Sequence, residues 1–401
     1  MAAKFLLLEG IHPVASHQLV ADGYEVEMLN TSLKEDDLVA KLAGVQVLGI
    51  RSKTQVTARV LDAAKDLLAV GAFCIGTNQV ALEHAMRRGI CVFNAPFSNT
   101  RSVAELVLAE IVVLSRHIGD RNNEMHRGLW RKVATGAHEV RGKTLGVVGY
   151  GHIGRQIGVI AEFFGMSVVF HDIAQRLPMG NNHPSPSLDA LLAQSDFVTL
   201  HVPETPQTKN LIGAGELAKM RRGACLLNLS RGTVVDLEAL AAAIKIGHIA
   251  GAAVDVYPEE PDANSSDGFK TPIQGLPNVF LTPHIGGSTL EAQESIGREV
   301  ATSLAKYLKD GATAGSVNFP IVELPRTAGT HRVINVHRNV PGVLRDVNKI
   351  VSDRDANILA QVLSTNADIG YLVMDFDAPS HHAIAEAMRA LPTTISARAV
   401  D

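Results

Sequence analysis

GVVGYGHIGR, residues 146–155, is the stretch from which most of this sequence can be interpreted. The apolar run over residues 144–148 predicts a short strand, and Gly149, Gly151 and Gly154 follow it before a helical pattern begins. In such a loop the first glycine supplies a tight turn, the second lets the backbone approach a pyrophosphate, and the third lets the helix pack on its strand. The N-terminus of the helix attracts the anion, so the stretch predicts a dinucleotide-binding site.

An acidic residue follows the next expected strand. The run over residues 167–171 ends at Asp172, eighteen residues past Gly154. A carboxylate at this point accepts hydrogen bonds from the ribose hydroxyls of an adenosine and repels a 2′-phosphate, which favours NAD over NADP. A glycine triplet by itself can also be a turn without a ligand, and Asp172 by itself can be a solvated turn residue. The strand, the helix and the acid together favour the dinucleotide.

Length and charge limit the classes to which the chain can belong. Its 401 residues predict two or three domains, and a hydrophobic content of 46% suffices for buried cores. The 37 Lys and Arg residues nearly balance the 41 Asp and Glu residues, which leaves a net charge of −4. This balance gives no reason to expect a nucleic acid or an anionic membrane surface as a partner.

The cysteines and the N-terminus indicate a cytoplasmic protein. The three cysteines lie far apart without a C-x-x-C pair, as expected of free thiols in a reducing compartment. The hydrophobic run in MAAKFLLLEG is too short for a secretory signal, and no apolar run is long enough for a membrane span. The 16 histidines show no helical H-x-x-x-H and no cysteine partner, so we expect no metal site.

Apolar runs and helical patterns divide the chain into three parts. Residues 1–98 alternate strand and helix in the rhythm of a parallel sheet, and the helical pattern after Gly287 is expected to return to that sheet. Residues 328–401 read βαββαβ, a ferredoxin-like plait. We therefore expect an α/β protein with two Rossmann-like parallel-sheet domains, one of them discontinuous, and a small C-terminal domain. The expected boundaries are 1–98 with 286–327 for a substrate-binding domain, 99–285 for a nucleotide-binding domain, and 328–401 for the third domain.

A long apolar helix is expected at the start of the second part. Ser102 and Glu105 form the S-x-x-E pattern of a capping box ahead of it. Asn99 and Arg101 stand at its N-terminus, where free backbone donors make a candidate anion site. The alternative is that both residues only cap the helix.

Polar residues follow each further strand expected in the nucleotide-binding part. The runs that begin at residues 197, 224, 249 and 279 end directly before polar or turn residues. In an open α/β sheet the ligand binds outside the carboxyl ends of the strands, so these residues are expected to face one crevice. They are His201, Ser230, Arg231, Asp255, Glu259, Glu260 and His284.

Three of these residue types fit the transfer of a hydride from an alcohol. His284 suits the base that takes the hydroxyl proton, because imidazole titrates near neutrality. Arg231 suits the cation that holds a carboxylate and polarises the forming carbonyl. A carboxylate against the imidazole would fix its tautomer, and Glu259 and Glu260 both qualify. Each residue by itself also fits a structural role, so the prediction depends on their common position.

Several motifs together resemble those of the D-isomer-specific 2-hydroxyacid dehydrogenases. They are GYGHIG at 149–154, HVPET at 201–205, NLSRGTVVD at 228–236, AAVDVYPEEP at 252–261 and LTPHIGGST at 281–289. Four more motifs are similar to the bacterial ACT-domain branch of that family: RSKT at 51–54, FCIGTNQV at 73–80, FNAPFSNTRSVAELV at 93–107 and HRNVPGVL at 337–344. The resemblance implies NAD-dependent oxidation of 3-phospho-D-glycerate, at the start of L-serine synthesis, by a homotetramer that L-serine inhibits at its ACT domain.

The resemblance also implies roles for individual residues. The catalytic residues of the family match Arg231, Glu260 and His284. Its substrate contacts match Arg51, Ser52, Asn99 and Gln293, and Lys132, beside the interface residue Trp130, matches a lysine that reaches the active site of a neighbouring subunit. The predicted cofactor-binding set is Gly149, Gly151, His152, Ile153, Gly154, Asp172, His201, Ser230, Asp255, Gly286 and Gly287. The L-serine site across a subunit interface matches His337, Asn339 and Asn357.

Two other functions stay open at this point. One is a broader 2-hydroxyacid dehydrogenase for an unphosphorylated acid such as 2-hydroxyglutarate or hydroxypyruvate. Three cationic residues argue against it: Arg51, Lys53 and Lys132. The other is a non-catalytic, NAD-sensing binding protein, and the presence of all three catalytic residue types argues against that.

Overall fold

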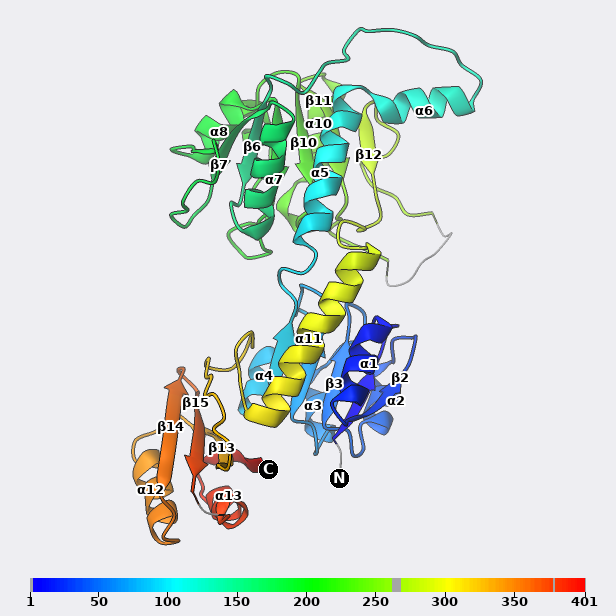
Figure 1. Cartoon of the computed structure of the whole chain (residues 1–401). Coiled ribbons are helices and arrows are strands. Elements are labelled where there is room, and N and C mark those ends of the chain that lie inside the picture. The colour runs from blue at the N-terminus through cyan, green and yellow to red at the C-terminus, as the bar shows by residue number, and fades with distance from the viewer. Residues whose placement is uncertain (1–2, 262–267, 378, 401) are drawn as a thin grey trace. The chain divides into compact units, whose positions relative to one another are not determined.

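The computed structural model describes residues 3–261, 268–377 and 379–400. The chain forms two units, Asn99–Ala292 and Met1–Ser98 with Gln293–Asp401 (Figure 1). Two parallel sheets and one antiparallel sheet, each with helices on it, confirm the α/β class predicted from the sequence. Among the described residues, no helix combines the length and the apolar character that crossing a membrane requires.

The unit Asn99–Ala292 contains a sheet of seven parallel strands in the order β12-β11-β10-β9-β6-β7-β8. The chain enters this sheet in the middle at β6, adds β7 and β8 on one side, and returns to the other side with β9. The reversal between β6 and β9 is the switch point at which such sheets bind ligands. The strands are β6 (Thr144–Val148), β7 (Ser167–His171), β8 (His183–Pro184), β9 (Phe197–Leu200), β10 (Ala224–Asn228), β11 (Ile249–Val254) and β12 (Val279–Leu281).

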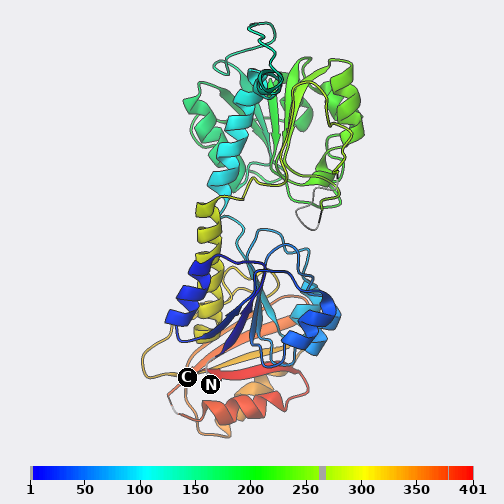
Figure 2. The same cartoon turned by 90° about the vertical axis from the view of Figure 1, so that its right-hand side faces the viewer.

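Helices cover both faces of this sheet, as Figure 2 shows for the unit. Successive side chains of β10 point to opposite faces of the sheet, and both sets are apolar, so both faces need a cover. Cys225 and Leu227 pack into one buried cluster, and Ala224 and Leu226 pack into the other. The first cluster includes α5 (Thr100–Ser115) and α7 (His152–Phe163), and the second includes α8 (Leu188–Gln194), α9 (Ala214–Lys219) and α10 (Leu237–Lys245). The helix α6 (Ile118–His126) and the 3-10 helix η1 (Gly232–Val234) complete the unit.

The start of α5 differs from the prediction. Its N-cap is Asn99, and no capping box of Ser102 and Glu105 precedes it. Ser102 Oγ lies 2.8 Å from Thr289 Oγ1, and Glu105 pairs with Arg101 at 2.6 Å. The capping-box prediction is therefore wrong, because a contact distant in sequence and an i,i+4 ion pair occupy the two side chains.

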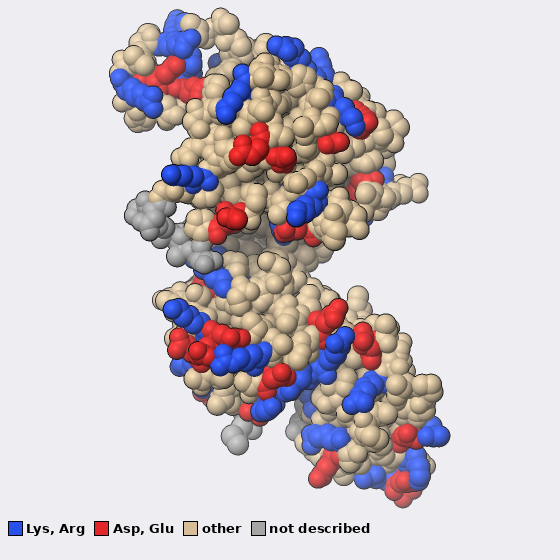
Figure 3. Space-filling model, turned by 180° about the vertical axis from the view of Figure 1, so that it is seen from behind, with Lys and Arg blue, Asp and Glu red and all other residues tan. Residues whose placement is uncertain are grey.

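Charged side chains of both signs are intermixed on the surface. On the face that Figure 3 shows, Lys and Arg lie among Asp and Glu on each unit. Among the exposed ion pairs of the described residues are Arg59 with Glu35 at 3.0 Å and Arg298 with Glu294 at 2.7 Å. That face therefore offers no extended surface of one sign to a polyanion.

The other unit contains five parallel strands in the order β2-β1-β3-β4-β5. Phe5 and Leu7 belong to one buried cluster and Leu6 and Leu8 to another, so this sheet is also covered on both faces. The strands are β1 (Lys4–Leu7), β2 (Glu25–Met28), β3 (Val47–Ile50), β4 (Ala69–Ala72) and β5 (Cys91–Asn94). The helices are α1 (Pro13–Ala21) and α11 (Leu290–Asp310) on the first face, and α2 (Glu35–Lys41), α3 (Ala58–Ala63) and α4 (Leu82–Arg87) on the second.

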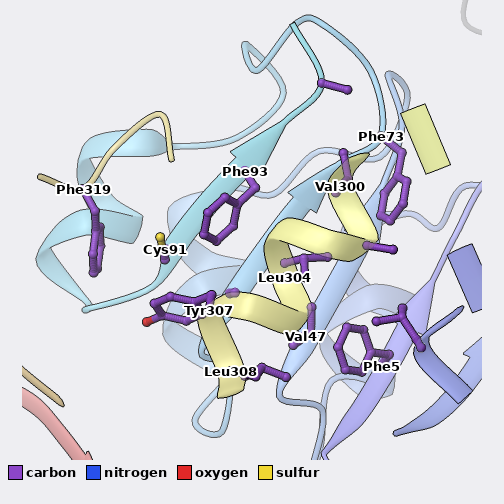
Figure 4. Close-up of a cluster of buried hydrophobic side chains, with 14 of the residues drawn as sticks. Phe5, Val47, Phe73, Cys91, Phe93, Val300, Leu304, Tyr307, Leu308 and Phe319 are labelled. Atoms are coloured by element: carbon purple, nitrogen blue, oxygen red, sulfur yellow. The ribbon is translucent and has the colours of Figure 1, made fainter. Parts of the chain in front are cut away.

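The helix α11 closes the first face of this sheet. Figure 4 shows Val300 and Leu304 of α11 in the same apolar cluster as Phe93 of β5. A Cβ on Gly71 of β4 would lie 2.8 Å from side-chain atoms of both Val300 and Leu304. Helix and sheet therefore approach each other this closely only because β4 carries a glycine there.

Residues 331–400 form an antiparallel sheet in the order β14-β15-β13-β16 with two helices on one face. This arrangement confirms the predicted ferredoxin-like plait. Its elements are β13 (His331–Arg338), α12 (Val343–Ser352), β14 (Ile358–Thr365), β15 (Ile369–Phe376), α13 (His381–Arg389) and β16 (Thr394–Val400).

The open face of this third sheet packs on the C-terminal end of α11 within the same unit. Arg332 of β13 is fully buried, pairs with Asp375 of β15 at 2.6 Å, and donates a hydrogen bond of 2.7 Å to the carbonyl oxygen of Asp310. Tyr371 Oη donates a hydrogen bond of 2.8 Å to the carbonyl oxygen of Gly311. Side chains of the third sheet thus satisfy backbone acceptors at the end of α11 that the helix leaves unpaired.

Candidate functional site

The loop between β6 and α7 has the backbone that a bound dinucleotide requires. Gly149 has a φ of +91°, and a Cβ there would lie 2.4 Å from the carbonyl oxygen of His201. A Cβ on Gly154 would lie 2.3 Å from the carbonyl oxygen of Gly149. A Cβ on Gly151, in contrast, would meet no atom of the described residues within 4 Å, so the protein's own packing does not demand this glycine. This open space is consistent with the prediction that a pyrophosphate approaches the backbone at Gly151.

Two further predicted cofactor contacts and the acidic residue lie beside this loop. His152 and Ile153 are the first residues of α7, whose N-terminal amides are natural donors to a phosphate. Asp172 follows β7, and its Oδ2 accepts a hydrogen bond of 2.9 Å from Tyr150 N and lies 3.4 Å from Arg176 Nε. The carboxylate is therefore anchored to the glycine loop, where ribose hydroxyls can donate to it.

The next two strand ends carry neutral side chains. His201 follows β9, its Nε2 lies 2.8 Å from Thr199 Oγ1, and burial lowers its pKa to about 3. Ser230 follows β10 and donates a hydrogen bond of 2.9 Å to Asn228 Oδ1. Both predicted cofactor contacts thus lie at the carboxyl end of the sheet without adding charge to it.

Asp255 anchors the loop that carries His284. It is buried at the end of β11, and it accepts hydrogen bonds of 2.8 Å from Ile285 N and from Gly286 N. Thr282 Oγ1 donates a third hydrogen bond at 2.6 Å. The carboxylate therefore holds the backbone after His284 and the side chain of Thr282 before it.

His284 and Glu260 form an ion pair. Nδ1 of His284 lies 2.7 Å from Oε2 of Glu260, whose Oε1 accepts a hydrogen bond of 3.1 Å from Tyr257 N. Glu259, the other candidate acid, is exposed like Glu260, but the carboxylate bonded to His284 is that of Glu260. The backbone of His284 has a φ of +54°, a strained conformation of the kind that clusters at active sites. Since Nδ1 is bound to the carboxylate, Nε2 is the nitrogen that can act on a substrate.

This pair shifts both pKa values. The hydrogen bond to Glu260 raises the pKa of His284, against the opposing effect of burial. Burial pushes the pKa of Glu260 up, but the hydrogen bonds from His284 and from Tyr257 N outweigh it and leave that pKa lowered. The imidazole is therefore a stronger base than usual beside an ionised carboxylate, as proton abstraction requires.

Arg231 stands directly after Ser230, as the residue before η1. The next residue is Gly232, and a Cβ on it would lie 1.9 Å from the carbonyl carbon of Tyr257. The loop of Arg231 therefore packs against the backbone that leads to Glu260. The positive charge of Arg231 lowers the pKa values of both Glu260 and His284. The three predicted catalytic residues therefore form one local group.

Three predicted substrate contacts lie in the other unit. Arg51 and Ser52 follow β3, at the carboxyl end of the five-stranded sheet. Gln293 is in the first turn of α11. The position of Arg51 and Ser52 is again the ligand-binding edge of a parallel sheet.

The remaining predicted substrate contacts belong to the unit of the catalytic trio. Asn99 is buried, and its Oδ1 has no hydrogen-bond partner among the described residues. A Cβ on Gly287 would lie 2.4 Å from Asn99 Nδ2, so this side chain and the glycine pair of the His284 loop are neighbours. Trp130 and Lys132 lie in the segment after α6, and both are exposed.

The structure does not bring the three predicted effector residues together within one chain. His337 is buried at the end of β13, and Asn339 Nδ2 donates a hydrogen bond of 2.7 Å to the carbonyl oxygen of Asn366. Asn357 precedes β14 at the opposite end of the sheet, because His337 is level with Gly370 and Thr365 in the strand register. An eight-residue strand spans roughly 25 Å, so one site containing all three residues needs a second copy of the chain.

Two buried acids go beyond what the sequence predicted. Glu110 on α5 is 1% exposed, and neither carboxylate oxygen has a hydrogen-bond partner among the described residues. Glu9 follows β1 and is 9% exposed. The sequence could have indicated that Glu110 is buried, because it stands seven residues after Val103 and three after Val107, on the apolar face of its helix.

Two segments of the chain match known families. Residues 108–286 match the family described as D-isomer specific 2-hydroxyacid dehydrogenase, NAD binding domain. Residues 334–396 match the family described as AHAS small subunit-like ACT domain. The first match contains the glycine loop, Asp172 and the catalytic trio, and the second contains most of the antiparallel plait.

Whole proteins match over nearly the full length. The chain is 53% identical to a D-3-phosphoglycerate dehydrogenase of Dictyostelium discoideum, over 98% of this chain and 96% of that one. It is 51% identical to the D-3-phosphoglycerate dehydrogenase of Escherichia coli K12, over 98% and 97%. Among solved structures, the TT0316 protein of Thermus thermophilus matches with a TM-score of 0.71 at 33% identity, over 78% of this chain and 99% of that one. An NAD-dependent formate dehydrogenase of Staphylococcus aureus in complex with NAD matches with a TM-score of 0.64 at 27% identity, over 76% and 95%.

Proposed function

The chain belongs to the family of the D-3-phosphoglycerate dehydrogenases, and we propose that it catalyses the NAD-dependent oxidation of 3-phospho-D-glycerate to 3-phosphohydroxypyruvate, the first step of L-serine synthesis. The observation that carries the proposal is the pair of His284 and Glu260, 2.7 Å apart beside Arg231 at the strand ends of the seven-stranded sheet. A base, its carboxylate partner and a cation are the groups that oxidation of a 2-hydroxy acid needs.

Each member of the trio has one role in this reaction. His284 Nε2 takes the proton of the C2 hydroxyl, and Glu260 stabilises the imidazolium that results. Arg231 holds the substrate carboxylate and polarises the carbonyl that forms at C2. When NAD is bound, its nicotinamide accepts the hydride that leaves C2. The residues that would hold NAD are the glycine loop with His152 and Ile153, Asp172, His201, Ser230, Asp255 and the Gly286–Gly287 pair.

The phosphate of the substrate requires further cations. Arg51 and Lys53 on the loop after β3, and Lys132 from a neighbouring subunit, are the residues that we assign to it. Ser52, Asn99 and Gln293 complete the substrate contacts. Arg forks match phosphate oxygens bidentately, which gives the phosphorylated acid its advantage over hydroxypyruvate.

The third sheet supports our proposals on regulation and assembly. The separation of Asn357 from His337 and Asn339 supports an L-serine site that two copies of the chain share, and with it a homo-oligomer, which we propose to be a tetramer. We divide the chain by role into a substrate-binding domain (1–98 and 286–327), an NAD-binding domain (99–285) and a regulatory ACT domain (328–401). The unbridged thiols of Cys74, Cys91 and Cys225 support a reducing, cytoplasmic location.

The test is NADH oxidation by the purified chain with 3-phosphohydroxypyruvate, hydroxypyruvate and 2-oxoglutarate side by side, each with and without L-serine. We expect a kcat/KM for the phosphorylated acid about a hundredfold above that for hydroxypyruvate, since two charged hydrogen bonds of this kind contribute about 3 kcal/mol. Arg51→Ala should remove most of this preference.

Each other result has its own meaning in this assay. Equal rates on all three acids would contradict the assignment and identify a broader 2-hydroxyacid dehydrogenase. Tight NADH binding without turnover would identify a nucleotide-sensing protein. A preference for the phosphorylated acid, at a rate that L-serine does not reduce, would support the enzymatic function and contradict the proposal that L-serine is an effector.

A further inference from the structure

The carboxylate of Glu9 lies inside the loop formed by residues 51–54. Its Oε1 accepts hydrogen bonds of 3.2 Å from Arg51 N and 2.8 Å from Thr54 N, and its Oε2 accepts one of 3.0 Å from Lys53 N. Glu9 follows β1, and the loop follows the adjacent strand β3. One side chain therefore holds three of the four backbone amides in the loop that we assign to the substrate phosphate.

The backbone at Glu9 is strained. Its φ is +64°, in the left-handed region that non-glycine residues rarely adopt, and the φ of Gly10 is +60°. Such a conformation is unfavourable by itself and persists only where the surrounding structure imposes it. Here it aims the carboxylate across the end of the sheet into the loop, where it is only 9% exposed.

A second buried side chain fixes the loop from its other side. Gln79 Nε2 donates a hydrogen bond of 2.6 Å to the carbonyl oxygen of Arg51. The backbone of Arg51 is thus held at its amide by Glu9 and at its carbonyl by Gln79. Ser52 and Lys53 in the middle of the loop are exposed.

From this arrangement we propose that Glu9 is a positioning residue for anion binding, which holds the 51–54 loop in the conformation that presents Arg51 and Lys53 to the phosphate of the substrate. The inference rests on the proposed function, because that function makes the loop a phosphate site. Glu9 touches neither substrate nor cofactor in this account, and it acts only through the loop.

An effect of the charge of Glu9 and an effect of its positioning role would change phosphate binding in opposite directions. If Glu9 acted only through its charge, removing a carboxylate beside two cations would strengthen the binding of a phosphate dianion. If it acts by positioning, the same removal releases the loop amides and weakens that binding. The sign of the effect therefore distinguishes the two.

The test is Glu9→Gln, measured with NADH and two keto acids, 3-phosphohydroxypyruvate and hydroxypyruvate. Glutamine has one acceptor oxygen, so its NH2 group must face a loop N–H and the loop loses at least one bond to a charged acceptor. We expect the KM for 3-phosphohydroxypyruvate to rise about 10- to 100-fold. The kcat, the KM for hydroxypyruvate and the Kd for NADH should stay within about twofold, because the trio and the glycine loop belong to the other unit.

Two more variants separate positioning from folding. Glu9→Gly removes the carboxylate and also relieves the left-handed strain, so its melting temperature should stay near that of the wild type while its KM for the phosphorylated acid rises as in Glu9→Gln. Glu25→Gln, an exposed carboxylate of β2 in the same unit, is the matched control and should change no parameter.

The outcomes separate this inference from the proposed function. A wild type that prefers the phosphorylated acid, with an unchanged or lower KM in both Glu9 variants, overturns the positioning role and leaves the function in place. A wild type without that preference overturns the proposed function and the phosphate assignment of the loop together. A KM that rises equally for both keto acids also overturns the inference, because it would reveal a general structural effect.

Discussion

His284→Asn is expected to lower kcat by about two to four orders of magnitude, the usual contribution of a general base. Asparagine can still meet Glu260, but it cannot take a proton. It also tolerates the left-handed backbone at this position, where the φ is +54°. The loss of rate should therefore come from the missing base and not from a rebuilt loop.

The measurement is steady-state reduction of 3-phosphohydroxypyruvate together with the affinity for NADH. We expect NADH to bind the variant as it binds the wild type, because the glycine loop and Asp172 are untouched. His183→Asn, which replaces an exposed histidine of β8 in the same unit, is the matched control and should retain full activity. A His284 variant within about threefold of the wild-type kcat would remove the histidine from the mechanism.

Glu110→Gln is expected to make the protein more stable than the wild type at high pH, because the wild type loses stability as the pH rises and the variant does not. Burial, supported by the charge of Asp255, raises the pKa of Glu110 to about 8 from an ordinary value of 4.5. In the folded state Glu110 therefore stays neutral up to about pH 8, while in the unfolded chain it ionises above pH 4.5. The contribution of this group to the free energy of unfolding is fully present below pH 4.5. It is lost as the pH rises from there toward 8, at about 1.4 kcal/mol for each pH unit.

Glutamine does not titrate, so the variant keeps its stability over the same range. The free energy of unfolding of Glu110→Gln relative to the wild type should increase by a few kcal/mol between pH 5 and pH 8. Urea unfolding at both pH values, followed by near-UV circular dichroism, measures this difference. Glu105→Gln, an exposed position on the same helix, should show no such trend. An equal difference at the two pH values would mean that Glu110 titrates normally.

Local patterns predicted the parts of the fold that depend on neighbours in sequence. The strand before Gly149 and the helix after it follow from the glycine loop and apolar periodicity alone. Asp172 was assigned from its place after the next strand. Its bond to Tyr150 N could be expected, because both residues belong to one strand–loop–helix unit.

Contacts between residues distant in sequence determine the features that local patterns could not predict. The expected capping box does not form, because Thr289, far along the chain, lies against Ser102. The bonds from Glu9 to the loop after β3 depend on β1 and β3 being adjacent and on the strained backbone at Glu9, neither of which a sequence pattern encodes. Asn357 and His337 lie at opposite ends of their sheet, which the order of the strands alone could have shown.

The most direct test of the central claim, that His284 is a base whose pKa Glu260 sets, is the pH dependence of kcat/KM for oxidation of 3-phospho-D-glycerate. The base must be unprotonated for oxidation, so the wild-type rate should fall as the pH drops below the raised pKa of His284. In Glu260→Gln the carboxylate that raises this pKa is gone, so the acidic limb should move to lower pH and kcat should fall. Glu259→Gln, one residue away and exposed, should keep the wild-type profile. An acidic limb at the same pH in Glu260→Gln and the wild type would contradict the account.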